Sequence, residues 1–178
     1  MPHAQTTAIQ LGLGSIRQHR FAEGIAQLEA VLAMWNASRL RHPYYKAVLG
    51  EGLSMLGQSD EALKLIDEAI EQVQRPDWGE RIHYAEILRL KGQILARKGD
   101  LVDGERSFLA SLDWAHEQQA KSWELRTSVS LARLWQSQDK HKEAHDLLAP
   151  VYDWFTEGFD THDLKEAKAL LEELEVTA

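Results

Sequence analysis

Two pairs of arginines are spaced so that each pair would share one face of a helix. Arg89 and Arg97 are eight residues apart and Arg126 and Arg133 are seven apart, which is about two helical turns in each case. A guanidinium group binds a carboxylate through two parallel hydrogen bonds, so a row of arginines suits an acidic peptide or a free C-terminal carboxylate. Alternatively, these arginines pair with acidic residues of the chain itself and keep its surface soluble. The sequence leaves both interpretations open.

A pair of histidines is the feature that comes nearest to a metal site. His141 and His145 are four residues apart in the run His141-Lys142-Glu143-Ala144-His145, so a helix would bring both imidazoles to one face. The zinc-protease motif needs a glutamate directly after its first histidine, a position that Lys142 occupies here, and no third ligand is evident. We interpret the pair as part of a solvated helix face and predict no metal site.

No other segment carries a recognisable catalytic arrangement. Gly12-Leu13-Gly14-Ser15 lacks both the lysine and the preceding strand of a phosphate-binding loop, and no nucleophile elbow or kinase signature occurs. Asp67, Glu68 and Glu71 form an acidic cluster that reads as a solvated helix face. Cysteine is absent, which excludes disulfides and thiol chemistry. We predict that the chain is not an enzyme and needs no cofactor.

Composition narrows the partner class. The chain of 178 residues has a formal net charge of −8 and 44% hydrophobic residues. The negative charge argues against nucleic acid and anionic membranes as partners. No apolar run is long enough to span a membrane, and the first twenty residues show no secretion signal. We therefore expect a cytoplasmic protein whose partner is a protein or peptide.

Small residues recur about every 40 residues, and this period defines the elements that position the arginines. The clearest copy contains Gly50, Gly57 and Ala62, and a second contains Gly92, Gly99 and Gly104. Each period reads as a helical hairpin in which small residues let two helices approach closely. Gly57 and Gly99 would end the first helices, and Asp60 and Asp100 would cap the second ones. Looser copies contain Gly24 and Ala144, each at the start of the second helix of its unit.

This period predicts an all-α chain that forms a single domain, 1–178. Break signals such as Pro76 and Gly79 separate the hairpins. Pro150 lies inside the last hairpin helix and should kink or shorten it. We expect hairpins at about 6–39, 43–74, 80–119 and 123–155, followed by a capping helix at about 161–175 with an apolar face of Leu164, Ala167, Leu170, Leu171 and Leu174.

The repeat register also assigns candidate binding residues. In a stack of hairpins, the first helix of each unit lines the concave groove. The candidate partner-binding residues are Arg17, Tyr44, Arg89, Gln93, Arg97, Arg126 and Arg133, with Glu51, Met55, Glu86 and Gln136 at related positions.

The six tryptophans supply a second possible contact surface. Trp35, Trp114, Trp135 and Trp154 fall at packing positions of their helices, so we predict that they are core residues. Trp78 and Trp123 lie at a break and near a helix start. Either of these two could bind a partner or could cover the end of a hairpin.

The spaced small residues resemble those of the tetratricopeptide repeat family across the whole chain. The two middle units carry the family's small residues, whereas the first and fourth units are degenerate and the periods are longer than usual. The resemblance implies a right-handed superhelix of hairpins that acts as a non-catalytic protein-interaction scaffold. A regulatory module that binds a small anionic ligand in the same groove is the alternative. Four segments also resemble the helical-repeat tails of bacterial signalling proteins that carry a nucleotide cyclase or a signalling ATPase: 86–92, 120–126, 130–135 and 147–171.

Overall fold

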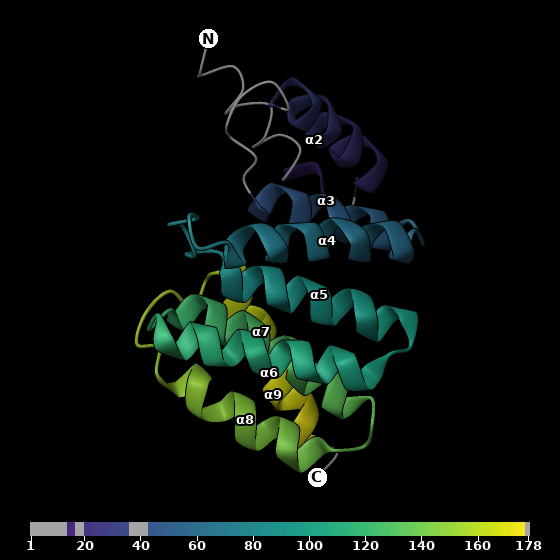
Figure 1. The fold of residues 1–178 in the computed structure, drawn as a ribbon. Helices are drawn as coiled ribbons and strands as arrows, with labels where there is room; N and C mark the ends of the chain where they lie inside the picture. The colour runs from purple at the N-terminus through teal and green to yellow at the C-terminus, as the bar shows by residue number, and fades with distance from the viewer. Residues whose placement is uncertain (1–13, 17–19, 36–42, 177–178) are drawn as a thin grey trace. The chain divides into compact units, whose positions relative to one another are not determined.

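Helices are the only regular secondary structure in residues 14–16, 20–35 and 43–176, the parts of the chain that the computed structural model describes. The chain divides into two compact units, 1–83 and 84–178. Within the described ranges, no helix is both long enough and apolar enough to cross a membrane. The helices are α2 (Phe21–Trp35), α3 (Pro43–Met55), α4 (Ser59–Gln74), α5 (Tyr84–Lys98), α6 (Leu101–Glu117), α7 (Lys121–Gln136), α8 (His141–Asp153) and α9 (His162–Val176) (Figure 1).

In the first unit, α3 packs against both α2 and α4. The hairpin of α3 and α4 is closed at Gly50, where a Cβ atom would lie 2.9 Å from the backbone oxygen of Ala62. The two helices therefore approach closely at these small residues, as the sequence predicts. Gly57 adopts the left-handed conformation (φ +82°) that ends a helix. Asp60 is not the cap of α4, because that helix already begins at Ser59 and its cap position is Gln58.

The second unit repeats this construction in α5 and α6. A Cβ atom on Gly92 would lie 2.6 Å from the buried ring of Phe108 and 3.0 Å from the backbone oxygen of Gly104. Gly99 has φ +95°, and the Asp100 side chain accepts a hydrogen bond from the Asp103 N–H, as the sequence predicts for a cap. These residues set the turn and the close crossing of one hairpin.

The α7–α8 hairpin and α9 complete the second unit. Leu170 and Leu174 of α9 are fully buried in a core that includes Leu148 of α8 and Leu125 of α7. This burial confirms that the apolar face of the last helix covers the core, although Leu171 is only partly buried.

Two helix boundaries differ from the prediction. Helix α5 begins at Tyr84 rather than near residue 80, because residues 78–81 are irregular and residues 82–83 form a turn. In that turn His83 stacks on Tyr44 of α3, with ring centroids 4.5 Å apart. Helix α8 contains Pro150 and ends at Asp153, which leaves Trp154 57% exposed rather than in the core. The first helix predicted in hairpin 6–39 falls mostly outside the described residues.

Candidate functional site

Three helices of the second unit lie in one layer. Helix α7 packs against α5 on one side and α9 on the other, while α6 and α8 pack behind them. Polar side chains of these three helices form a network that we call the arginine face. Its members are Glu86, Arg89 and Gln93 of α5, Arg126, Ser130, Arg133 and Gln136 of α7, and Asp163, Glu166 and Glu173 of α9.

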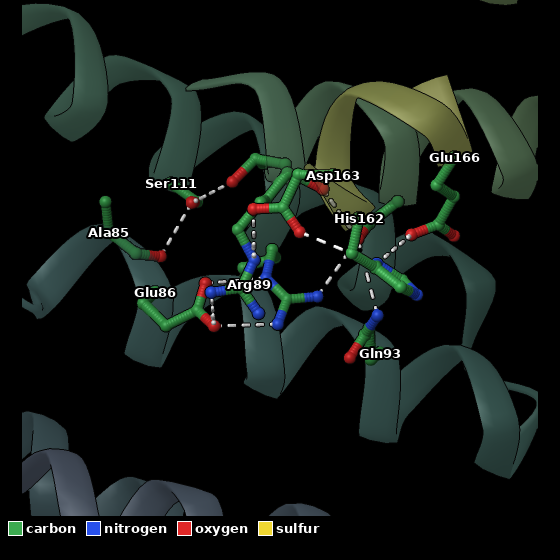
Figure 2. A network of polar contacts seen from close by, with 11 residues as sticks. Ala85, Glu86, Arg89, Gln93, Ser111, His162, Asp163 and Glu166 are labelled. Atoms are coloured by element: carbon green, nitrogen blue, oxygen red, sulfur yellow. Dashed lines mark hydrogen bonds and ion pairs between the residues drawn. The ribbon is translucent and has the colours of Figure 1, made fainter. Parts of the chain in front are cut away.

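A buried ion pair forms the centre of the arginine face. The side chains of Arg89 and Glu86 are only 6% and 3% exposed. Arg89 donates to Glu86 twice, from Nε to Oε2 at 2.7 Å and from Nη2 to Oε1 at 2.8 Å (Figure 2). This paired geometry is the strongest that a guanidinium and a carboxylate can make. Arg89 therefore works mainly as an internal support of the face.

Ser130 joins α5 to α7 at this centre. Arg89 Nη1 and Gln93 Nε2 both donate to Ser130 Oγ, at 3.2 and 3.3 Å. Ser130 Oγ in turn lies 3.0 Å from the backbone oxygen of Arg126, to which it donates. The amide oxygen of Gln93 is buried and has no hydrogen-bond donor among the described residues. Two helices are thus held in register by side chains rather than by apolar packing alone.

Arg126 connects the buried centre to the exposed part of the face. Its Nη1 atom lies 2.9 Å from Glu86 Oε1, and its Nε atom lies 3.9 Å from Asp163 Oδ2 of α9. The guanidinium also lies over the Trp123 ring, 5.3 Å from its centroid, where a cation is attracted to the aromatic face. The side chain is 25% exposed, so part of it remains open to a partner.

Arg133 forms the exposed end of the face. Its Nη1 atom lies 3.2 Å from Glu173 Oε2, and its Nε atom lies 3.8 Å from Glu166 Oε1. Gln136 donates to the same oxygen of Glu173 at 3.3 Å. Because Arg133 is 42% exposed, water screens these ion pairs and each contributes little to stability.

The structure gathers four of the predicted binding residues on the arginine face: Arg89, Gln93, Arg126 and Arg133. Arg97 is exposed in the last turn of α5. Tyr44 is buried in the first unit against His83, and Arg17 lies outside the described residues. The acids of α9 were not among the predicted site residues, although the spacing of Asp163, Glu166 and Glu173 places them on one face of that helix.

The histidine pair of α8 is surrounded by carboxylates. His141 Nε2 lies 3.9 Å from Asp139 Oδ1, and His145 Nε2 lies 3.9 Å from Glu175 Oε1. In the described part of the chain, no three residues of the His, Asp or Glu type are grouped closely enough to hold a metal ion.

A pocket of about 700 Å³ adjoins the arginine face at Asp163. The start of α7, the 154–161 connection between α8 and α9, and the first turn of α9 form its walls. It is lined by Ser122, Leu125, Trp154, Phe155, Thr156, Glu157, Gly158, Thr161, Asp163 and Leu164.

The fold resembles that of solved helical-repeat structures. It matches the nearly identical TPR-like repeats of a candidate kinesin light chain from Podosopora anserina with a TM-score of 0.63 and 15% identity, over 99% of this chain and 96% of that one. A single-substitution variant of the same repeats matches with a TM-score of 0.64 and 15% identity, over 99% and 95% of the two chains. No protein-family model matches the sequence, and no curated protein matches it. At this identity the likeness establishes the fold alone: the chain has an all-α, tetratricopeptide-like repeat fold.

Proposed function

We propose that the chain is a non-catalytic protein-interaction module that contacts a partner peptide or domain through the arginine face. The observation that carries this proposal is the gradient of burial across the face. The Glu86–Arg89 pair is buried, Arg126 contacts Glu86 and is 25% exposed, and Arg133, which pairs with Glu173 of α9, is 42% exposed. A surface whose polar groups are already held in place costs less to order when a partner binds.

The partner chemistry follows from the arginines. Guanidinium groups favour carboxylates, so an acidic segment or a free C-terminal carboxylate is the partner that we propose. Asp163, Glu166 and Glu173 of α9 already lie beside Arg126 and Arg133. A partner carboxylate would therefore share or replace these exposed pairs, which is feasible because each contributes about 0–1 kcal/mol. Such binding should weaken as salt concentration rises.

One further predicted residue belongs to the same proposal. Arg97 would extend the face along α5, where it is exposed in the last turn of the helix. The resemblance of the C-terminal segments to bacterial signalling tails supports a cytoplasmic signalling role as the finer form of the proposal.

The alternative, a sensor of small anions, gains no support from the pocket beside the arginine face. The ionisable residues that line this pocket are Glu157 and Asp163. Carboxylates repel an anion at neutral pH, so an anionic metabolite would be disfavoured there.

A matched pair of variants tests the proposed function. Arg133→Ala removes an exposed arginine from the face, and Arg106→Ala removes a more exposed arginine from α6, where it pairs with Asp103. Proteins captured by the full chain would be quantified by mass spectrometry for the wild type and both variants. We expect a set of proteins that Arg133→Ala loses and Arg106→Ala retains, and the same capture by both variants would contradict the proposal.

A further inference from the structure

The pocket beside α9 combines an apolar interior with an exposed aromatic rim. Leu125 and Leu164 are buried residues that line it, and Phe155 is partly buried. Trp154 packs edge-on against Phe155 with centroids 5.1 Å apart, yet it is 57% exposed. Phe159, in the same connection, is also exposed. Exposed tryptophan beside a pocket is the kind of residue that contributes most to binding in protein interfaces.

The electrostatics of the pocket favour a cation. Among the described residues, Glu157 forms no ion pair, and it is exposed. Asp163 lies 3.9 Å from Arg126, so its charge is only partly offset. The N-terminus of α9 adds a partial positive charge, but Asp163 lies in the first turn of that helix and counters it. A carboxylate at the rim therefore remains for a cationic group of a ligand.

Lys121 shows that the aromatic rim already attracts a cation. Its Nζ atom lies 5.6 Å from the centroid of the Trp154 ring and 2.7 Å from Glu124 Oε2. Because Lys121 already lies over the Trp154 ring, a second cation would be repelled there, and a partner's Lys or Arg would lie at Glu157 instead.

We infer that this pocket binds a partner segment in which a large apolar side chain neighbours a lysine or arginine. The apolar side chain would enter between Leu125, Phe155 and Leu164, beside Trp154, and the basic side chain would lie at Glu157. A pocket of about 700 Å³ is in the range that holds a group of this size. The inference rests on the proposed function in one respect, that the occupant is a peptide, but it concerns a different surface and the opposite charge.

Random heptapeptides displayed on phage and selected on the immobilised full chain provide the test. We expect the wild type to enrich peptides that contain a large apolar residue next to Lys or Arg. Trp154→Ala should reduce their binding at least tenfold, and Glu157→Lys should reduce it similarly, whereas Glu157→Gln should have a smaller effect. Leu109→Ala, which removes an exposed apolar residue from α6, is the matched control and should bind as the wild type does.

Several results would overturn the inference. Enrichment of acidic peptides, enrichment that survives Trp154→Ala, or no enrichment at all would each do so. Concentration-dependent dimerisation that Trp154→Ala abolishes would show that a second copy of the chain occupies the pocket. Arg133→Ala separates this inference from the proposed function, because it should leave the basic peptides bound while losing partners of the arginine face. Thermal unfolding of each variant verifies that it is folded.

Discussion

Removing Arg89 should destabilise the second unit far more than removing Arg133 does. Arg89 makes two charge-assisted hydrogen bonds to Glu86 in a site where both side chains are almost fully buried. Arg89→Met would remove two hydrogen bonds from the buried Glu86 carboxylate, which would still have Arg126 2.9 Å away. Breaking a buried pair costs about 3–5 kcal/mol, and because Arg126 remains we expect about 3 kcal/mol. Arg133→Ala breaks exposed pairs and should cost about 0–1 kcal/mol.

Urea unfolding followed by tryptophan fluorescence and circular dichroism measures both variants. A loss of about 3 kcal/mol corresponds to a fall in melting temperature of roughly 6–12 °C for a chain of this size. The double variant Glu86→Met/Arg89→Met removes both buried charges, so it should be more stable than Arg89→Met alone. If Arg89→Met lost less than about 1 kcal/mol, or if the double variant were the less stable, Arg89 would not be the internal support of the face.

Three further predictions concern packing and ionisation. Gly92→Ala should destabilise the chain by about 1–2 kcal/mol, since overpacking against Phe108 costs about 1–3 kcal/mol and the better helix propensity of alanine returns up to about 1 kcal/mol. In urea unfolding, adding Phe108→Leu to Gly92→Ala should recover part of this loss. If the stability losses of the two substitutions simply added, the contact between positions 92 and 108 would be contradicted. Leu170→Ala should cost about 2–5 kcal/mol because Leu170 of α9 is fully buried against the core of α7 and α8. An unchanged unfolding midpoint would show that α9 does not cover the core. Burial and, secondarily, the charge of Glu80 raise the pKa of Tyr45 above its usual value of 10.0. The neutral Tyr45 side chain therefore contributes its full stability below pH 10, and this contribution is lost as pH rises through the higher pKa of the folded state. Above pH 10 the Tyr45→Phe variant should lose less stability than the wild type, and identical stability profiles against pH would refute the raised pKa.

The hairpins could be predicted because their cause is local. Gly50 and Gly92 are required where two helices cross, and Gly57 and Gly99 are required where a helix ends with positive φ. The equivalent turn of the fourth hairpin, between α7 and α8, uses Asp139 (φ 60°), and the connection between α6 and α7 uses Gln119 (φ 53°). These residues tolerate the left-handed conformation at a cost in free energy. Because no glycine marks the turn of the fourth hairpin, that repeat is harder to recognise in the sequence.

The arginine face could be predicted only in part. The spacing of Arg126 and Arg133 correctly placed both on one side of α7. Their partners Glu86 and Glu173 are about 40 residues away in sequence, and such pairs depend on how the hairpins stack. The burial of Arg89 has the same origin, because α7 covers a position that an isolated helix would expose. The prediction that Trp154 is a core residue was wrong because α8 ends at Asp153, soon after Pro150. Trp154 therefore no longer follows the helical spacing that would turn it toward the core.

Site-specific photo-crosslinking in cells tests the proposed binding surface most directly. In one variant a photoreactive amino acid would replace Gln136 on the arginine face. In the matched control it would replace Leu109, an exposed residue of α6 that lies outside the layer formed by α5, α7 and α9. The account predicts discrete crosslinked proteins from position 136 that are absent from position 109 and that diminish when Arg133→Ala is added. Crosslinks from position 109 alone, or an equal pattern from both positions, would contradict the claim that this chain binds its partner through the arginine face.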